Sequence, residues 1–292
     1  MDVVPLHCCP SVLPVPPGSK GVGKTTLIHR FLEREEAPKQ TLALEYTFGR
    51  KTNQNLIKDV CHIWELGGGT MYTNLIETPL SPDKLTSSAV VLVVDLSKPE
   101  RMWSTVTSLI SSVGEYIAAA LKTEEAKRLK VEERLEKEAQ DRIGEEHGDI
   151  KHLQPFPLPL LILGGQYDVF QDFEPEKKKL ICRSLRYLAH LHGASLQFYS
   201  AKDPGLVKKA RDLLSHHGFN TPPGKGMSQV NNICIDNEFN LSPGLQQAAH
   251  HPDRLGLVAG NPGRRWRRGA QVGRDEAPVW HPLPPGKIIS SL

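Results

Sequence analysis

The segment from Gly18 to Thr25 reads G-S-K-G-V-G-K-T and matches the phosphate-binding loop pattern G-x-x-x-x-G-K-S/T. Such a loop turns successive backbone N–H groups toward β- and γ-phosphates, while its lysine adds positive charge and its hydroxyl binds Mg²⁺. This geometry requires a buried strand before the loop and a helix after it, which points to an α/β fold. The candidate nucleotide-binding residues here are Gly18, Gly21, Gly23, Lys24, Thr25 and Thr26.

The two flanks of this loop lead to opposite predictions. Residues 25–36 place Leu27, Ile28 and Phe31 at helical spacing, so they are predicted to form the helix. Residues 10–17 read P-S-V-L-P-V-P-P. Because proline cannot donate to a ladder and is excluded from central strands, we expect residues 1–17 to be an irregular leader. The first strand of the fold is therefore predicted to be missing or replaced.

Beyond the loop, apolar runs alternate with helical patterns. The predicted strands cover residues 41–48, 60–64, 89–94, 158–163 and 195–199, the first two as a potential hairpin. The predicted helices cover residues 102–146, 174–192 and 206–217, the last two closed by Gly193 and Gly218. Such alternation predicts a mostly parallel central sheet that helices cover on both faces, in a domain spanning residues 18–220.

The predicted helix over residues 102–146 has two different halves. Its first half carries one apolar stripe, formed by Val106, Ile110, Val113, Ile117 and Leu121. Its second half is densely charged, with opposite charges four residues apart, as in Glu133 and Lys137. We expect residues 121–147 to be a solvated or partner-facing helix rather than part of the core.

The composition narrows the class of protein. The net charge of +3 is too small to indicate nucleic acid or a membrane surface as a partner. No apolar run approaches the roughly 20 residues that a membrane span needs, so we expect no membrane insertion. The five cysteines form no C-x-x-C pair and show no metal spacing. Their odd number, together with the absence of a signal sequence, favours reduced thiols in the cytosol.

Periodicity is lost after about residue 220. Residues 221–292 are predicted to be a linker and a disordered tail, because residues 241–292 are rich in Gly, Pro and Arg without an apolar pattern. The run R-R-W-R-R at residues 264–268 has two interpretations, contact with RNA or acidic lipid, or a solvated cluster. A lone cluster in such a tail favours the solvated one.

A second segment fits the phosphate loop in position. Residues 62–69 read H-I-W-E-L-G-G-G after a predicted strand and resemble the W-D-x-x-G segment of Ras-like GTPases, which contacts Mg²⁺ and the γ-phosphate. Glu65 stands at the acidic position and Gly68 at the glycine. Glu65 and Thr25 are therefore candidate Mg²⁺ ligands when nucleotide is bound. Gly69 stands where a glutamine would orient the attacking water, and glycine has no side chain for that role.

Two further segments stand where a Ras-like protein contacts the base. Asp168 matches the acid of N-K-x-D, but Gly165 and Gln166 replace its Asn and Lys, so guanine selectivity is not expected. Residues Ser200, Ala201 and Lys202 match the S-A-K loop. Asp168 is alternatively a helix or turn cap. Either Thr41 or Thr47 fits the switch threonine, and their spacing leaves both open.

Together these segments resemble the light intermediate chains of cytoplasmic dynein, most closely those of dynein-2, the retrograde motor of intraflagellar transport. The similar strings lie at residues 18–26, 41–47, 64–70, 95–99, 167–174 and 192–196. W-E-L-G-G-G and Y-D-V-F-Q-D-F are far more specific than the phosphate loop alone. The resemblance runs from about Gly18 to Asn240, and one hypothesis is that both ends of the chain are substituted.

The resemblance implies a Ras-like P-loop fold in a non-catalytic subunit. Its implied partners are the dynein-2 heavy chain and other dynein-2 subunits, with microtubules reached only through the motor. It implies a place in the cytoplasm and cytoskeleton, the cilium, the ciliary basal body and the centrosome. No cofactor is required, and GTP or GDP with Mg²⁺ is expected to bind weakly at most. The alternatives are a small GTPase that switches by hydrolysis and a nucleotide-binding structural domain without turnover.

Overall fold

The structure is a computed structural model that describes residues 11–15 (backbone only), 22–39, 41–52, 58–67, 75–143 and 152–221. Its strands are β1 (Ser11–Val15), β2 (Leu44–Thr52), β3 (Lys58–Leu66), β4 (Ser88–Asp95), β5 (Leu160–Gly165) and β6 (Ser195–Phe198). Its helices are α1 (Lys24–Phe31), α2 (Pro99–Leu121), α3 (Glu124–Arg128), α4 (Val131–Ile143), α5 (Tyr167–Phe170), α6 (Pro175–His192) and α7 (Pro204–Phe219), with a 3-10 turn, η2 (Leu85–Ser87).

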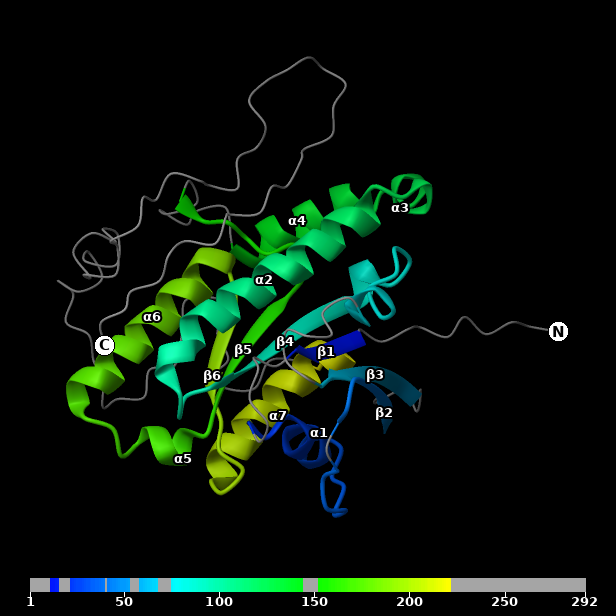
Figure 1. Ribbon diagram of the computed structural model, residues 1–292. Coiled ribbons are helices and arrows are strands. Elements are labelled where there is room, and N and C mark those ends of the chain that lie inside the picture. The colour runs from blue at the N-terminus through cyan, green and yellow to red at the C-terminus, as the bar shows by residue number, and fades with distance from the viewer. Residues whose placement is uncertain are drawn as a thin grey trace.

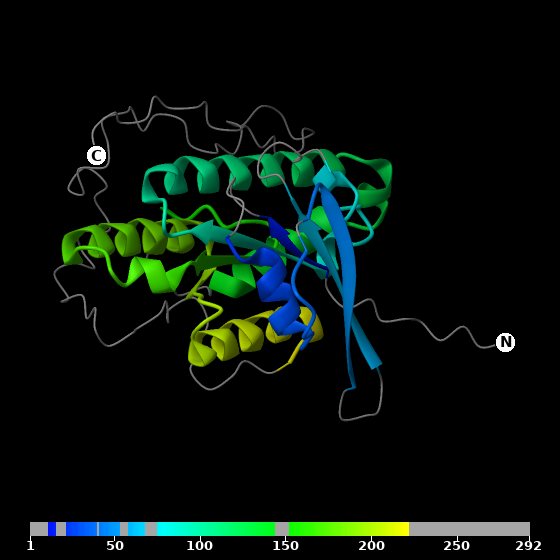
Figure 2. The same ribbon diagram turned by 60° about the horizontal axis from the view of Figure 1, so that its bottom comes forward.

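One six-stranded sheet with the order β2-β3-β1-β4-β5-β6 forms the centre of the fold. All neighbouring strands run parallel except β2 and β3, which form an antiparallel hairpin. Figures 1 and 2 show α2 and α6 on one face of the sheet and α1 and α7 on the other. Every residue of β4 is buried, as a strand covered on both faces must be. The predicted α/β architecture is confirmed.

The first strand is present, so the prediction that it is missing was wrong. β1 lies between β3 and β4, and its residues from Ser11 to Val15 pair in parallel register with Ser88 to Leu92. Pro14 lies opposite Val91 within this strand. The proline ring fixes φ near −65°, which is within the extended region, so Pro14 removes one N–H donor without preventing strand geometry. One proline in a short strand therefore weakens the ladder and leaves the strand in place.

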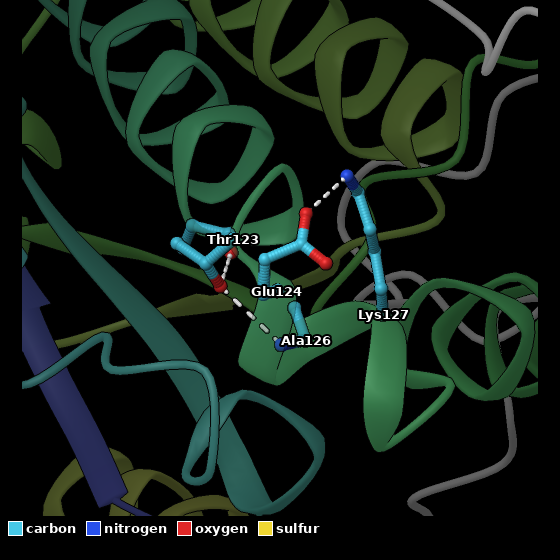
Figure 3. A network of polar contacts seen from close by, with 5 residues as sticks. Thr123, Glu124, Ala126 and Lys127 are labelled. Carbon is cyan, nitrogen blue, oxygen red and sulfur yellow. Dashed lines mark hydrogen bonds and ion pairs between the residues drawn. The ribbon is translucent and has the colours of Figure 1, made fainter.

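The predicted helix over residues 102–146 is three helices. Thr123 ends α2 by donating its hydroxyl to the Ala120 carbonyl (2.7 Å), and it begins α3 by accepting from the Ala126 amide (3.3 Å). Figure 3 shows this cap together with the Lys127–Glu124 ion pair (2.8 Å). Lys130, with a φ of 51°, then makes the turn into α4. A threonine cap satisfies the amides that a new helix leaves without partners, so the chain changes direction here.

One face of the charged helix α4 is buried in the core. This corrects the expectation that the helix faces only solvent or a partner. Its residues Val131 and Leu135 are 1% and 2% exposed, and they share a core cluster with Val113 of α2. The stripe predicted for α2 joins the same cluster. The charged residues Glu133 and Lys137 are exposed. Hence α4 anchors through one face and leaves the other accessible.

Helix ends differ in detail from the sequence patterns. Gly193 closes α6 with a φ of 60°, as predicted. Gly218 lies inside α7, and Asn220 closes that helix with a φ of 47°, since asparagine tolerates the left-handed conformation. Within the described ranges, no helix is both long and apolar enough to cross a bilayer. The leader's residues 1–10, 16 and 17 and the tail's residues 222–292 lie outside the described residues, so the domain limit at 220 stays a prediction. The predicted limit at 18 is too late, because β1 belongs to the sheet.

Candidate functional site

The described part of the phosphate loop turns directly into α1. Gly23 has a φ of 92°, a conformation that glycine adopts without a steric penalty. The next residue, Lys24, begins α1, and the Leu27 amide donates to the Gly23 carbonyl at 2.8 Å. Thr25 and Thr26 follow in the first turn. The candidates Gly18 and Gly21 lie outside the described residues.

Glu65 at the end of β3 meets this first turn. The Thr25 hydroxyl donates to Glu65 Oε1 at 2.8 Å, although the two residues are 40 positions apart in the chain. Glu65 is only 3% exposed. Burial raises the pKa of Glu65, while hydrogen bonds from Thr25 and Thr41 and the charge of Lys24 oppose the shift. Burial likewise lowers the pKa of Lys24, against the attraction of Glu65. The predicted pairing of Thr25 with Glu65 thus exists in three dimensions.

The structure distinguishes the two candidate switch threonines. Thr41 is buried, donates its hydroxyl to Glu45 Oε2 at 3.0 Å and lies close enough to Glu65 to contribute to holding down the pKa of that carboxyl. Thr47 lies on β2, where it accepts from Arg34 Nη2 at 2.8 Å. Only Thr41 therefore belongs to the site.

Gly67 fixes the position of Thr41. A Cβ at Gly67 would lie 2.4 Å from the Thr41 carbonyl oxygen, and the Gly67 amide donates to the Ala43 carbonyl at 2.6 Å. Only glycine lets the two backbone segments approach this closely. The spacing of the sequence gave no sign of this contact.

Thr25 and Glu65 fit a Mg²⁺ ion that a bound phosphate also holds. Their oxygen atoms are the hard ligands that Mg²⁺ prefers, and such sites usually combine one or two carboxylates with substrate phosphates. Across the described residues, no group of three or more His, Cys, Asp or Glu side chains could hold a metal by itself. The metal assignment to Thr25 and Glu65 stays a prediction that depends on nucleotide.

The predicted base-contact residues come together at the ends of β5 and β6. Asp168 accepts from the Ser200 hydroxyl at 3.1 Å and from Lys202 Nζ at 2.5 Å. The Lys202 amide donates to the Ser200 hydroxyl oxygen at 3.2 Å, so the S-A-K loop that includes Ala201 is closed on itself. The hydrogen bond from Lys202 is the main cause that lowers the pKa of Asp168. The carboxylate predicted to meet a base is thus engaged by its own neighbours.

The packing around Gly165 disfavours an asparagine at this position. A Cβ there would lie 3.0 Å from the Val22 carbonyl oxygen and 3.3 Å from Val22 Cγ1. The end of β5 therefore packs against the phosphate loop through the space that an asparagine side chain needs. Gln166, with a φ of 58°, then turns the chain into α5. Gly68, the candidate for the γ-phosphate contact, and Gly69, at the position that would orient water, lie outside the described residues.

Tyr199 is a site residue that the sequence analysis missed. It is 2% exposed, and its ring lies 4.0 Å from the position of a Cβ built on Gly23. Its hydroxyl has no hydrogen-bond partner among the described residues, and burial raises the pKa of Tyr199 to about 12. As the last apolar residue of a predicted strand, Tyr199 looked like core. It does belong to the buried cluster that includes Val22 and Leu27, and through it Tyr199 borders the phosphate loop at Gly23.

Comparison with known proteins places this geometry in a family. The sequence profile of the family described as Dynein light intermediate chain (DLIC) matches residues 9–155, about half of the chain. The chain belongs to the dynein light intermediate chain family. The match begins at residue 9, so this dynein light intermediate chain resembles its family before Gly18 as well, where the sequence analysis saw no similarity. That extension is consistent with the presence of β1.

Two relatives of this light intermediate chain are similar over most of its length. It is 43% identical over 220 residues to cytoplasmic dynein 2 light intermediate chain 1 of Bos taurus, covering 75% of this chain and 61% of the relative. It is 45% identical over 218 residues to the protein of the same name from Danio rerio, covering 72% of this chain and 59% of the relative. The chain thus spans about three fifths of the length of these relatives.

A solved structure shows the same fold. The crystal structure of the dynein light intermediate chain's conserved domain superimposes with a TM-score of 0.56 at 16% sequence identity. The superposition covers 78% of this chain and 79% of the solved one. The predicted Ras-like fold class is therefore confirmed.

Proposed function

We propose that this chain is a non-catalytic light intermediate chain subunit of the dynein-2 motor. It binds and stabilises the dynein-2 heavy chain, together with other dynein-2 subunits, for retrograde intraflagellar transport and cilium assembly. Its relatives that are 43% and 45% identical carry the name cytoplasmic dynein 2 light intermediate chain 1, which supports dynein-2 as the complex. Its place is in the cytoplasm and cytoskeleton, at the cilium, its basal body and the centrosome.

Two glycines support the non-enzymatic part of this proposal. A Cβ at Gly165 would lie 3.0 Å from the Val22 carbonyl oxygen, so an asparagine at this position would crowd the backbone of the phosphate loop. Gly165 also lacks the side-chain amide of asparagine, so we do not expect the base-selective contact of a Ras-like switch in this chain. Gly69 adds to this on sequence grounds, because it has no side chain to orient an attacking water. Force generation and ATP hydrolysis then belong to the heavy chain.

Recovery of the heavy chain tests the proposed partner. Tagged full-length chain, expressed in ciliated cells, is expected to co-purify a dynein-2 heavy chain. The exposed face of α4 is the proposed contact, so Glu133→Lys with Glu136→Lys should lower this recovery several-fold. Glu174→Lys with Glu176→Lys, at the exposed start of α6, makes the same charge change and should not. Normal expression of the chain without any heavy chain recovered would contradict the proposal.

The phosphate-loop site can be tested for nucleotide binding independently of the heavy-chain contact. We infer at most weak binding of GTP or GDP with Mg²⁺, through Lys24 and Thr25 and with Glu65 near the metal. Calorimetry with GTP, GDP and ATP, using Lys24→Ala as the control, measures this directly. GTP turnover by the native chain above that of Lys24→Ala would favour the GTPase alternative instead.

A further inference from the structure

The β2–β3 hairpin presents an exposed aromatic surface at one edge of the sheet. We define the aromatic face as Tyr46 and Phe48 of β2 with His62 and Trp64 of β3. Tyr46 and Phe48 are 45% and 40% exposed, although each is a large ring. The centroid of the Tyr46 ring lies 4.8 Å from that of Trp64 and 6.4 Å from that of Phe48. The three rings therefore form one continuous surface. Figure 2 shows the hairpin at the side of the sheet, with one end near α2 and the other reaching away from it.

The opposite side of β2 is basic where it meets α1 and α7. Arg34 donates to Thr47, and Lys51 Nζ lies 5.9 Å from the centre of the Phe219 ring. Both basic side chains are exposed, and we call Arg34 with Lys51 the basic face. Since successive residues of a strand point to opposite sides, the two faces flank the same backbone. Glu45, also on this side, accepts from Thr41.

The backbone edge between these faces has no partner strand among the described residues. β2 is the first strand of the sheet and pairs only with β3. An edge strand presents unpaired N–H and C=O groups, and an extended segment that pairs with them completes the ladder. A strand whose one side is apolar and whose other side is acidic would match both faces.

The sequence contains such a segment 14 residues beyond the last described residue, which itself follows a contact with β2. The described chain ends at Thr221, two residues after Phe219, which lies 3.3 Å from the position of a Cβ built on Gly49 of β2. Residues 235–241 read I-D-N-E-F-N-L, so one alternate set is Ile235, Asn237, Phe239 and Leu241, mostly apolar, and the other is Asp236, Glu238 and Asn240, polar and acidic. The linker from residue 221 to residue 235 can span up to about 46 Å when extended, well beyond the distance across a hairpin.

We propose that residues 235–241 add to the free edge of β2 as a further strand. Ile235, Phe239 and Leu241 then lie against the aromatic face. Asp236 and Glu238 lie beside the basic face, where their carboxylates meet Arg34 and Lys51. Because side chains of a strand alternate between its two sides, the apolar contacts and the acidic contacts form together. Turning the segment over would place its acidic residues on the aromatic face, so only one orientation fits. This pairing covers the exposed rings of Tyr46 and Phe48.

Disulfide trapping with the natural Cys234 tests which side the segment faces. Cys234 shares its side with Asp236, so it should approach Lys51 and not the adjacent Arg50, whose side chain lies over Phe48 on the aromatic face. In the full chain with Cys8→Ser and Cys9→Ser, Lys51→Cys should form an intramolecular disulfide at least tenfold faster than Arg50→Cys. Cys61 and Cys182 are buried and serve as the common background. Equal rates at the two positions would overturn the proposal, as would disulfides between chains.

Charge exchange gives an independent test. Asp236→Lys with Glu238→Lys in the full chain should raise amide hydrogen exchange in β2 at least tenfold, because the edge then loses its partner. Adding Arg34→Glu and Lys51→Glu should restore slow exchange. Exchange in β2 that is unchanged by the first pair, or that the second pair does not restore, would show that another segment or another molecule covers this edge.

Discussion

The guanidinium of Arg142 joins the end of α4 to the loop that leads into β5. Its Nη2 donates to the Phe156 carbonyl at 2.7 Å and to the Pro157 carbonyl at 3.1 Å. Burial lowers the pKa of Arg142 to about 10, and Glu138 opposes this shift, so the side chain stays charged at neutral pH. Arg142→Met keeps the aliphatic stem and removes both donors, which leaves two carbonyls without their partner.

The expected loss of stability follows from those two bonds. A buried acceptor left without a donor costs about 1–3 kcal/mol, and relief of the buried charge offsets part of the total. Arg142 is only partly buried, so water reaches the carbonyls in the variant and the lower end applies. We expect Arg142→Met to lower the free energy of unfolding by about 2 kcal/mol, or the melting temperature by about 4–8 °C in a domain of this size. Arg142→Lys, which offers one nitrogen in place of a planar fork, should lose less.

Urea denaturation followed by circular dichroism measures this loss, with Arg134→Met as the control. Arg134 is an exposed arginine on the same helix, so its replacement should change little. A second readout is His217, whose pKa burial lowers to about 4 with help from His216 and Arg142. Its pKa should rise in Arg142→Met, as an NMR titration can detect. Variants of Arg142 and Arg134 that agree within about 0.5 kcal/mol would refute this reasoning.

Two further predictions concern the phosphate-loop site. Gly67→Ala places a methyl group 2.4 Å from the Thr41 carbonyl oxygen, a backbone atom that cannot rotate away. The free energy of unfolding, measured from the denaturant midpoint, should therefore fall by about 1–3 kcal/mol. An unchanged midpoint would show that the close approach of Gly67 to Thr41 is not needed for stability. Glu65 has a pKa raised above its ordinary 4.5 by burial, so its folded form holds the proton more tightly and native stability falls as pH rises from 4.5 through the raised value. Glu65→Gln lacks this titration, so its stability relative to the native chain should increase over that pH window. Thermal melts recorded at each pH measure the difference, and parallel stability curves for the two proteins would contradict a raised pKa of Glu65.

Local sequence patterns predicted most elements because each depends on its own residues. The continuous apolar run at Ala89–Val94 could only be a strand covered on both faces, and it is part of β4. Gly193 ended α6 as its position after an apolar pattern predicted. The sequence-based prediction failed at Pro14, which lies within β1. The rule that proline is excluded from central strands is a statistical preference, and it does not measure what the loss of a single N–H donor costs a short strand. The prediction failed again at Thr123, where charge periodicity continued across a cap that starts a new helix.

For this protein, the sequence alone determined the α/β class and the type of most of its elements, and it indicated candidate residues at the phosphate loop and base loops, which stay predictions. Those follow from periodicity and from motif spacing, which are properties of neighbouring residues. Only the tertiary structure decided that Thr41 rather than Thr47 joins Glu65, that Gly165 packs against Val22, and that Tyr199 lies under Gly23. These contacts join residues far apart in the chain, and their distances depend on how the strands are placed in the sheet, which no local pattern encodes.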